Sequence, residues 1–499
     1  MKLGALAERA GITLSEGGDA SVTGFAIDHR KVAPGTVFGA FRGASFNAED
    51  VIPEAIQAGA VAVVARPEVA VEGAVHIADE EPRRAFARLA AGFFTPMPNV
   101  IVAVTGTNGK TSTVEMTRQI WRMCGERAAS IGTLGVTTPD ESVSTGLTTP
   151  DIVTFLSNMS GLAREGVTHV AYEASSHGLS QYRNEGVPVS ACAFTNFSRD
   201  HLDYHKDMED YFAAKMRLFD EVVDDGGTAV IWHGGEGSEW TRRAIEHAQQ
   251  RALRVFTAGE QGEDIRLLAR TPTQLGQTLE IEYEGMQRTI KLPLIGAYQA
   301  SNALVAAGLA LVSGADASMV FDAVGRLQPV RGRLERAVIA PQGSPVYVDY
   351  AHTPDAIEAA IAALKPHVDA EKNGRLITVF GAGGDRDAGK REPMGRAAAD
   401  QSDIVIVTDD NPRGEDAGAI RAQVMKGVHA AGSEGAQEIG GRRAAIAEAI
   451  RLAGAHDIVL IAGKGHEQGQ IIGSGENMRV LPFDDVTVAR ECAAEQGAA

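Results

Sequence analysis

Cysteine is scarce in this sequence, and the three cysteines that it has lie far apart. Cys124, Cys192 and Cys492 show no paired metal-binding spacing and argue against a disulfide framework. No apolar run approaches the roughly 18 residues of a membrane-spanning helix, and residues 1–4 do not begin an apolar signal peptide. We therefore expect a cytoplasmic protein with no integral membrane association.

A basic excess is also missing. The 47 Lys and Arg residues stand against 65 Asp and Glu residues, which gives a formal net charge of −18. Because a protein binds a nucleic-acid backbone through a basic face that neutralises phosphates, we expect no nucleic-acid partner. Anionic small molecules can still bind where Arg, Lys and backbone N–H groups converge, so we look for such places along the chain.

No short internal repeat or low-complexity block appears, which excludes a solenoid. The 499 residues are 44% hydrophobic and 22% charged, as in a globular protein with several cores. At about 100–200 residues per domain, this length predicts roughly three domains. Short β-branched apolar runs alternate with alanine-rich stretches of helical period, so the predicted fold class is α/β. We place the domains at residues 1–92, 93–332 and 333–499, with a proline-bearing linker near residue 95.

Apolar runs mark the predicted strands. Residues 60–65 form one in the first domain, residues 100–104 open the second, and a helical stretch runs from Ser112 to about Cys124. The runs of the third domain are residues 346–348, 376–380, 404–407 and 458–461. These four are apolar on both faces, as in parallel strands covered by helices, and a polar, glycine-rich or charged loop follows each. Because ligands of open parallel sheets bind at the carboxyl ends of the strands, we expect a site there.

The run of residues 100–104 leads into the sequence G-T-N-G-K-T at residues 106–111, and a helical stretch follows. A strand, a glycine-rich turn and a helix hold phosphates on backbone N–H groups and on the helix N-terminus. Lys110 is expected to reach the β- and γ-phosphates of a nucleotide, and the Thr111 hydroxyl to hold Mg²⁺. Val104 stands at the first glycine position of the strict motif, so an ordinary strand-to-helix turn is the alternative. No N-K-x-D motif for guanine appears, which favours ATP over GTP.

Carboxylates, histidines and a lysine gather in the second domain. Glu173 ends a strand-like run, His201 and His205 lie in the acidic segment 195–205, and Lys215 lies in a helical stretch. Mg²⁺ suits such a group, because it takes one or two carboxylates together with substrate phosphates. An exposed polar turn is one alternative, and a zinc site is another, since the two histidines are four residues apart. By residue type alone, Lys215 is an exposed helix lysine.

The segment from Thr105 to Ser112 resembles the phosphate loop of the Mur ligase family, which includes folylpolyglutamate synthetases. Further segments match the family in the expected order along nearly the full chain. The resemblance implies an N-terminal UDP-MurNAc-binding domain at 1–92, a central P-loop ATP-binding domain at 93–332 and a C-terminal Rossmann-like amino-acid-binding domain at 333–499. It implies that Mg²⁺ is held by Thr111, Glu173, His201 and a carbamylated Lys215. The residues that it marks as catalytic are Lys110, Lys215, Glu173 and His201.

Two segments of the third domain resemble the nucleotide contacts of the family. In R-G-R-L-E, residues 331–335, Arg333 is expected to clamp a phosphate, although by itself it is as readily a structural ion pair. The segment D-Y-A-H-T-P-D, residues 349–355, is expected near the nucleotide. Tyr298-Gln299 stands where the family has an aromatic residue followed by asparagine. The residues expected at ATP are Gly106, Thr107, Asn108, Gly109, Lys110, Thr111, Ser112, Asn302, Arg333, Asp349 and His352.

The sequence D-N-P-R at residues 410–413 follows a predicted strand. Its arginine can bind a carboxylate in bidentate fashion, and its Asp and Asn can hold an ammonium group; an Asx-Pro turn is the alternative. Within the family, this segment is typical of the members that add meso-diaminopimelate, whereas lysine-adding members differ at the arginine. The residues expected at diaminopimelate are Arg386, Asp410, Asn411, Pro412, Arg413, Gly463 and Glu467.

The acceptor that the resemblance implies is UDP-MurNAc-L-Ala-D-Glu. His29 stands where relatives carry a serine, and residues 43–46 also depart from the common pattern. The residues expected at this acceptor are Ile27, His29, Thr148, Thr149, Ser175, Gln181 and Arg183.

The implied activity is that of a monomeric, ATP-dependent ligase of peptidoglycan synthesis. ATP would convert the D-Glu γ-carboxylate into an acyl phosphate, which an amine of meso-diaminopimelate then attacks. A lysine-adding ligase and a folylpolyglutamate synthetase are rival enzymes, and a catalytically silent nucleotide-binding regulator is a rival of another class. The intact set Lys110, Thr111, Glu173, His201 and Lys215 favours an enzyme.

Overall fold

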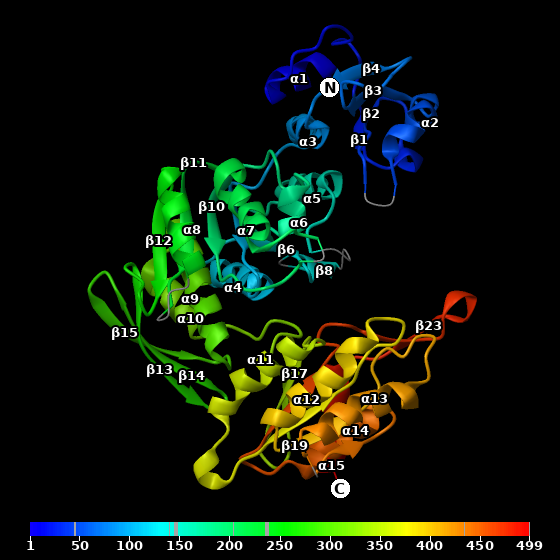
Figure 1. Cartoon of the computed structure of the whole chain (residues 1–499). Helices are drawn as coiled ribbons and strands as arrows, with labels where there is room; N and C mark the ends of the chain where they lie inside the picture. Colours follow the sequence, from blue (N-terminus) through cyan, green and yellow to red (C-terminus); the bar gives the residue numbers. More distant parts are fainter. Residues whose placement is uncertain are drawn as a thin grey trace. The chain divides into compact units, whose positions relative to one another are not determined.

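The computed structural model describes residues 1–43, 46–138, 140–143, 148–202, 204–234, 239–433 and 435–498. The chain divides into two compact units. Unit 1 comprises Met1–Asp264 and Val305–Val320, and unit 2 comprises Ile265–Leu304 and Phe321–Ala499. Figure 1 labels the helices and strands of both. In the part of the chain that the structure describes, no helix is long and apolar enough to cross a membrane.

Unit 1 begins with a parallel sheet of strand order β1-β2-β3-β4. Val37 and Val64 of this sheet pack in one core with helices α1 and α3, whereas Phe38 and Val63 pack in another with α2. Helices therefore cover both faces. The elements are α1 (Leu3–Ala10), β1 (Gly24–Ala26), η1 (His29–Lys31), β2 (Thr36–Gly39), η2 (Ala48–Val51), α2 (Ile52–Gln57), β3 (Ala60–Ala65), β4 (Val75–Ala78) and α3 (Pro82–Phe93).

A second sheet in unit 1 carries the phosphate loop. Its strands follow the order β12-β11-β10-β5-β9-β6-β7-β8; the pairs from β12 to β6 are parallel and the last two are antiparallel. Because β5 lies between β9 and β10, the carboxyl ends of those two strands flank the loop that follows β5. The strands are β5 (Val100–Thr105), β6 (Ala128–Gly132), β7 (Gly135–Thr137), β8 (Ser142–Val143), β9 (His169–Glu173), β10 (Val189–Phe194), β11 (Val223–Trp232) and β12 (Arg254–Gly259). The helical elements are α4 (Lys110–Met123), α5 (Ile152–Arg164), α6 (Ser176–Ser180), α7 (Met208–Arg217), the π-helical turn η3 (Leu218–Val222) and α8 (Glu239–Gln250).

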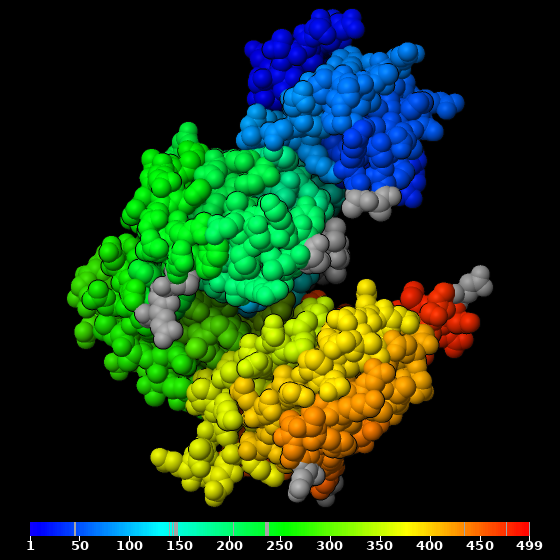
Figure 2. Space-filling view, viewed as in Figure 1, coloured from blue at the N-terminus to red at the C-terminus, as the bar shows by residue number. Residues whose placement is uncertain are grey.

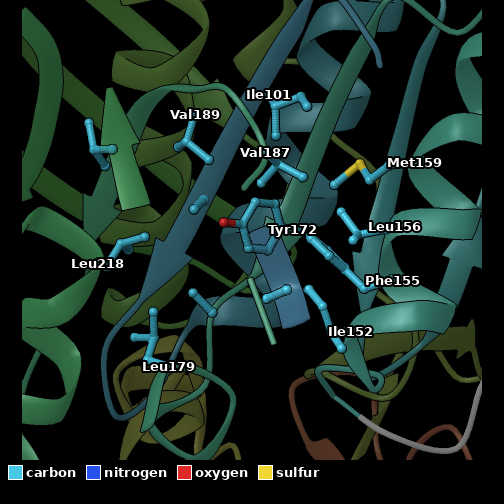
Figure 3. Packing of buried hydrophobic residues seen from close by; sticks show 14 of the residues in the cluster. Ile101, Ile152, Phe155, Leu156, Met159, Tyr172, Leu179, Val187, Val189 and Leu218 are labelled. Carbon is cyan, nitrogen blue, oxygen red and sulfur yellow. The ribbon is translucent and has the colours of Figure 1, made fainter. Parts of the chain in front are cut away.

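The core of unit 1 contains a tyrosine among apolar side chains. Figure 3 shows Tyr172 of β9 between Phe155 and Leu156 of α5 on one side and Val187 and Val189 on the other. The rings of Phe155 and Tyr172 meet edge to face, with centroids 5.0 Å apart. Among the described residues, no hydrogen-bond partner reaches the buried Tyr172 hydroxyl. This core thus contains one polar atom that burial deprives of water.

Unit 2 opens with consecutive antiparallel strands. They are β13 (Ile265–Thr273), β14 (Gly276–Tyr283) and β15 (Met286–Leu292). Helices α9 (Ala297–Val312) and α10 (Ala317–Val324) follow along the chain, and the stretch Val305–Val320, which includes part of each, belongs to unit 1.

The C-terminal sheet of unit 2 has the strand order β16-β17-β21-β18-β19-β20, with every pair parallel except β16–β17. Its strands are β16 (Glu335–Ile339), β17 (Pro345–Asp349), β18 (Leu376–Phe380), β19 (Ile404–Val407), β20 (Gln437–Glu438) and β21 (Ile458–Ala462). Its helical elements are α11 (Pro354–Leu364), η4 (Lys365–His367), η5 (Ala370–Lys372), η6 (Ala388–Lys390), α12 (Arg391–Gln401), α13 (Ala417–Ala430), α14 (Arg442–Leu452), η7 (Gly475–Asn477) and α15 (Asp485–Gly497).

Successive side chains of the central strands face two different cores. Leu460 packs with helices α11, α12 and α13, whereas its neighbours Val459 and Ile461 pack with α14 and α15. Helices on both faces of a parallel sheet make the Rossmann-like, three-layer arrangement. Since β17, β21, β18 and β19 run parallel, the polar loops after them lie at one edge of this sheet.

A separate two-stranded hairpin lies against the loops that follow the strands of the C-terminal sheet in unit 2. It consists of β22 (Gly469–Ile472) and the antiparallel β23 (Arg479–Pro482). Its residues lie at the surface in Figure 2, in red, and Val480 and Leu481 are 60% and 44% exposed.

The predicted α/β class with a P-loop domain and a Rossmann-like domain is confirmed. The runs at 60–65, 376–380 and 404–407 coincide with β3, β18 and β19. The helix expected from Ser112 begins two residues earlier, because Gly109, with φ 84°, caps α4 directly before Lys110. The domain boundaries after residues 92 and 332 stay predictions.

Candidate active site

The phosphate loop joins β5 to α4 in a conformation that the neighbouring strand fixes. Gly106 has φ 141°, and a side chain there would collide with Thr195 at the end of β10. Asn196 O accepts a hydrogen bond from Thr107 N, and Asn196 Oδ1 accepts one from Asn108 N, both at 2.9 Å. Hydrogen bonds within the protein therefore support the shape of the loop.

Two lysines converge on the carbonyl oxygen of Gly106. Lys110 Nζ donates to Gly106 O at 2.9 Å, and Lys215 Nζ, from α7, donates to the same oxygen at 2.7 Å. Lys110 Nζ also donates to Thr107 O at 2.8 Å. Lys215 lies over the ring of Tyr211, one helical turn earlier, at 4.3 Å from its centroid. Burial, with Lys110 nearby, holds the pKa of Lys215 well below its ordinary value.

The expectation from residue type that Lys215 is exposed is wrong. The side chain is 1% exposed, because positions 211 and 215 share the face of α7 that packs under the phosphate loop. Ser112 and Thr111, at the start of α4, are also buried.

Glu173 ends β9 one strand away from the phosphate loop. It pairs with Val104 of β5 in the parallel ladder and is 2% exposed. Its Oε1 accepts a hydrogen bond from Thr133 N at 2.7 Å, and its Oε2 accepts one from Thr133 Oγ1 at 3.3 Å. Thr148, expected at the acceptor, contacts Thr133 Oγ1 through its own hydroxyl at 3.1 Å.

The other acceptor residues expected in this domain form one hydrogen-bonded network with Glu173. Thr149 Oγ1 donates to Glu173 O and contacts Ser175 Oγ, both at 3.0 Å. Arg183 Nη1 donates to Thr149 O at 2.9 Å, and Arg183 Nη2 donates to Gln181 Oε1 at 2.8 Å. The structure thus brings these predicted residues together.

His201 and His205 point into different surroundings. The His201 side chain is 42% exposed, whereas His205 is buried with Nδ1 at 3.2 Å from Asp210 Oδ2. Both rings lie near His177, with centroids 5.2 and 5.8 Å from it. No group of three or more His, Cys, Asp or Glu side chains in the described residues is placed to hold a metal ion. Asp203 lies outside the described residues.

Ile27 and His29 lie between β1 and β2 and are partly exposed. Asp28 caps the short turn in which His29 stands. The ring of His29 is roughly parallel to that of Phe46, with centroids 6.4 Å apart. Ala44 and Ser45, which depart from the family pattern, lie outside the described residues.

In unit 2, Asp349 lies buried at the end of β17. Its Oδ2 accepts a hydrogen bond from Leu334 N at 2.8 Å, and its Oδ1 accepts one from Ala351 N at 2.9 Å. Burial raises the pKa of Asp349 above its ordinary value. His352 contacts Tyr350 O through Nδ1 at 2.8 Å.

Asn302 and Arg333 are joined through Gln299. Asn302 Nδ2 donates to Gln299 Oε1 at 3.3 Å, and Gln299 Nε2 donates to Arg333 O at 3.0 Å. The Arg333 guanidinium lies over the Tyr350 ring, 5.4 Å from its centroid. The residue that departs from the family pattern at position 299 therefore links two expected nucleotide contacts.

Four side chains form a cluster where β19 and β21 end. Lys464 Nζ lies 2.8 Å from Asn411 Oδ1, 3.2 Å from Asp410 Oδ1 and 3.4 Å from Glu467 Oε2. Asn411 Nδ2 donates to Glu467 Oε2 at 3.0 Å. Three residues expected at diaminopimelate thus surround one lysine.

The hairpin β22–β23 holds the loop that follows β19. Arg413 N donates to Ile471 O at 3.1 Å, and Gly473 N donates to Arg413 O at 2.7 Å. Ile471 N donates to Asn411 Oδ1 at 2.9 Å. The backbone of the expected D-N-P-R contact is therefore fixed from a segment about 60 residues away.

The remaining residues expected at diaminopimelate lie outside the cluster around Lys464. Arg386 is exposed, and it makes no hydrogen bond or ion pair with the described part of the chain. Arg413 Nη1 donates to Gly384 O at 2.9 Å. Pro412 lies between the fixed residues of the D-N-P-R loop, and Gly463 N donates to Asp349 O at 3.1 Å.

Three buried cations that sequence reasoning left without a role hold the strand-end loops of unit 2. Lys464 is 0% exposed, Arg391 1% and Arg442 2%. Arg391 Nη2 donates to Gly383 O at 3.1 Å, and Arg442 Nη2 donates to Ala462 O at 2.9 Å. Their signal in the sequence is weak, because a basic residue near a strand end is ordinarily solvent-exposed.

The two units offer different chemistry. In unit 1, backbone N–H groups at a helix start and Lys110 suit phosphate groups. In unit 2, the carboxylates of Asp410 and Glu467 suit an ammonium group, and the guanidinium of Arg413 suits a carboxylate. A phosphate site and an amino-acid site together are what a nucleotide-driven ligase needs.

Comparison with known families gives two matches. The Mur ligase middle domain matches residues 104–310, and the glutamate ligase domain of Mur ligases matches residues 332–465.

Known relatives and solved structures extend the likeness to the whole chain. The UDP-N-acetylmuramoyl-L-alanyl-D-glutamate–2,6-diaminopimelate ligase of Zymomonas mobilis is 59% identical over 490 residues, 98% of each chain. The ligase of that name from Bradyrhizobium diazoefficiens is 49% identical over 93% of each chain. A solved structure of a ligase of that name superposes with a TM-score of 0.74 at 32% identity, over 99% of each chain. The ADP complex of Mycobacterium tuberculosis folylpolyglutamate synthase, at 20% identity, TM-score 0.59 and 77% and 92% coverage, shares the fold alone. The chain therefore belongs to the Mur ligase family.

Proposed function

We propose that this chain uses ATP to join meso-2,6-diaminopimelate to the D-Glu γ-carboxylate of UDP-MurNAc-L-Ala-D-Glu. The reaction makes an amide and belongs to cytoplasmic peptidoglycan precursor synthesis. The observation that carries the proposal is the 59% identity, over 98% of both chains, to a ligase named for these two substrates. We expect the active form to be a monomer.

The ATP phosphates bind at Gly106 to Ser112. Lys110, which donates to Gly106 O and Thr107 O in this structure, turns its ammonium group toward the β- and γ-phosphates. The γ-carboxylate oxygen attacks the γ-phosphorus, and ADP leaves. An amine of diaminopimelate then attacks the acyl carbon, and phosphate leaves as the amide forms. Positioning and charge neutralisation account for the catalysis, as in phosphoryl transfer generally.

Isotope transfer tests the acyl phosphate. The γ-carboxylate of the acceptor is labelled with heavy oxygen, and the released phosphate is analysed. We expect one labelled oxygen in the phosphate, because the carboxylate oxygen that bonded to phosphorus leaves with it. Unlabelled phosphate from a productive reaction would contradict this route.

Mg²⁺ fits the donor set only in part as the side chains stand. Thr111 offers a hydroxyl, Glu173 a carboxylate and His201 an imidazole, but Lys215 in its amine form is not a metal ligand. A carbamate on Lys215 adds the second carboxylate, and hard oxygen donors of this kind are what Mg²⁺ takes. When bound, Mg²⁺ neutralises phosphate charge.

The surroundings of Lys215 support carbamylation. Only the unprotonated amine reacts with carbon dioxide, and burial beside Lys110 lowers the pKa of Lys215. The product is an anion next to the Lys110 ammonium, so a neutral amine becomes one partner of an ion pair. Labelled bicarbonate gives a direct readout: nuclear magnetic resonance should detect a carbamate in the wild type that is missing from Lys215→Met.

The decisive experiment for the proposed function is an assay of ATP-dependent phosphate release with UDP-MurNAc-L-Ala-D-Glu. We expect meso-diaminopimelate to support turnover and L-lysine not to, because Arg413 and the Asp410 cluster suit a second amino-acid centre with both charges. Turnover with lysine alone would assign the chain to the lysine-adding branch. Phosphate release with a folyl substrate instead would assign it to the folylpolyglutamate synthetases.

The regulator alternative is tested with Lys110→Ala. We expect this variant to lose about 100-fold or more in kcat, the usual cost of removing a group that stabilises transition-state charge. Undiminished activity would contradict the assignment of the phosphate loop.

A further inference from the structure

Lys464 is a fully buried lysine to which the proposed reaction gives no role. It follows β21 in the turn G-K-G and is 0% exposed. Burying an unpaired ammonium group is costly, so a lysine at zero exposure is held by partners. Those partners all belong to the diaminopimelate contacts proposed above.

Lys464 Nζ makes two hydrogen bonds and one ion-pair contact with three neighbouring oxygens. Asn411 Oδ1 lies at 2.8 Å, Asp410 Oδ1 at 3.2 Å and Glu467 Oε2 at 3.4 Å from Nζ. An ammonium group has three donors and no acceptor. The first two partners follow β19 and the third follows β21, so Lys464 connects two loops of the sheet edge.

Lys464 also fixes the orientation of the Asn411 amide. Asn411 Oδ1 accepts from Lys464 Nζ and from Ile471 N at 2.9 Å. With its oxygen directed to two donors, the amide presents Nδ2 to Glu467 Oε2 at 3.0 Å. Rotating this amide would lose three hydrogen bonds, so Asn411 has one orientation.

The net charge of the cluster formed by Lys464, Asp410, Asn411 and Glu467 suits one ammonium group of a ligand. One lysine stands between two carboxylates, which leaves one negative charge. Among the described residues, the buried Asp410 Oδ1 has no hydrogen-bond partner, although Lys464 Nζ lies 3.2 Å from it, and the bonds to Glu467 all use Oε2. Asp410 Oδ1 and Glu467 Oε1 can therefore accept hydrogen bonds from a ligand.

We propose that Lys464 is the positioning residue of the amino-acid pocket. It holds Asp410, Asn411 and Glu467 in the arrangement that receives the far ammonium group of the incoming diamino acid. The inference rests on the proposed function, because that function places these three residues at diaminopimelate. Lys464 itself touches no substrate.

The test is Lys464→Met, which keeps the length of the side chain and removes its charge. KM is measured for each of the three substrates, with phosphate release as the readout. We expect KM for diaminopimelate to rise about 10- to 100-fold, the range for lost hydrogen bonds to charged groups. We expect KM for ATP, KM for the UDP-linked acceptor and kcat at saturation to stay unchanged. Lys365→Met, at an exposed lysine whose Nζ donates only to Gln401 O, is the matched control.

A double-mutant cycle with Glu467→Gln separates positioning from loss of fold. If Lys464 acts through Glu467 and Asn411, its replacement costs less in the Glu467→Gln background than in the wild type. If Lys464→Met does not fold, Glu467→Gln is compared with the double variant Lys464→Met/Glu467→Gln. The double variant has one fewer carboxylate left without its lysine partner. KM for diaminopimelate should still rise there, through Asp410 and Asn411.

Two results would overturn the inference: an unchanged KM for diaminopimelate, or an equal rise in all three KM values. Additive effects in the cycle would also contradict it. A failure of the proposed function looks different, because the wild-type chain itself would then not use diaminopimelate.

Discussion

At the scale of single residues, the phosphate loop brings two lysine side chains to one carbonyl oxygen. Lys110 and Lys215 both donate to Gly106 O. Burial disfavours the charged form of Lys215, and the nearby Lys110 ammonium adds repulsion, so the pKa of Lys215 lies well below its ordinary value. The role of Lys110 could be predicted, because a glycine-rich loop before a helix marks it. The burial of Lys215 could not, because it depends on which face of α7 packs under a loop about 100 residues earlier.

Lys215→Met is expected to raise the free energy of unfolding at neutral pH in bicarbonate-free buffer. Above the ordinary lysine pKa of 10.5, the amine is neutral in both states and the substitution gains nothing from charge. As the pH falls below that value, the unfolded chain binds a proton that the folded chain does not, so folding of the wild type is penalised. The gain should therefore grow from pH 10.5 downward until the lowered pKa is reached.

Urea unfolding across this pH range measures the effect. Lys206→Met, at an exposed position on the same segment, is the control and should show no such pH dependence. A gain for Lys215→Met that is the same at every pH would show that packing, not charge, is responsible.

Tyr172→Phe is expected to raise the free energy of unfolding by about 1 kcal/mol, because it removes a buried hydroxyl that has no hydrogen-bond partner among the described residues. The ring contacts with Phe155 remain. The matched control is Tyr347→Phe, whose buried hydroxyl donates to Gln274 O at 3.2 Å. That variant should lose about 1 kcal/mol, since it leaves the carbonyl unpaired. Loss of stability in Tyr172→Phe would show that the hydroxyl has a partner in solution.

At the scale of helices and strands, burial decides which elements can be predicted from the sequence. Strands such as β18 and β19 are apolar on both faces and could be predicted almost to the residue. The antiparallel strands β13 to β15 were not recognised, because their exposed polar residues interrupt the apolar pattern. The sequence likewise contains no sign that Arg442, the first residue of α14, meets Asp485, the first residue of α15. Such a pairing depends on how two helix starts meet on one face of a sheet.

Breaking the Arg442–Asp485 pair should be among the most destabilising single changes in unit 2. Both side chains are 0% exposed, and their two hydrogen bonds measure 2.7 and 2.6 Å. Asp485→Leu leaves a buried, unpaired guanidinium group and should cost about 3–5 kcal/mol. Adding Arg442→Met removes that charge as well, so the double variant should recover part of the loss. A double variant less stable than Asp485→Leu in urea titrations would contradict this account.

At the scale of the whole chain, the resemblance runs from end to end, so the family could be predicted from motifs in order. The net charge of −18 is compatible with this picture, because Lys110 and Lys215 stand at the phosphate loop and Arg391, Arg442 and Lys464 are buried near strand ends of unit 2. The family resemblance gives no role to the supports of the site, such as Lys464 and Arg391. Their positions depend on long-range packing that no local pattern encodes.

Nucleotide binding should stabilise, by linkage, the unit that binds the nucleotide. ADP with Mg²⁺ at about 100 times its Kd is expected to add about 2.7 kcal/mol to the free energy of unfolding of the unit that binds it. Thermal unfolding with and without nucleotide checks this, and Lys110→Ala should reduce the shift because its phosphate contact is lost. Magnesium removal by chelation should reduce it as well. A full shift in Lys110→Ala would place the phosphates elsewhere.

The hairpin β22–β23 and the loop that follows β19 are joined by hydrogen bonds. Residues 410–413 are held by Ile471 and Gly473, which lie about 60 residues later in the chain. Because Ile471 and Gly473 supply only backbone atoms to these bonds, we expect the position of the hairpin, rather than these two side chains, to support the loop. A graft of residues 410–413 alone into another ligase would place the loop against a foreign hairpin. A graft that also carries residues 469–482 would move the loop together with the hairpin that holds it.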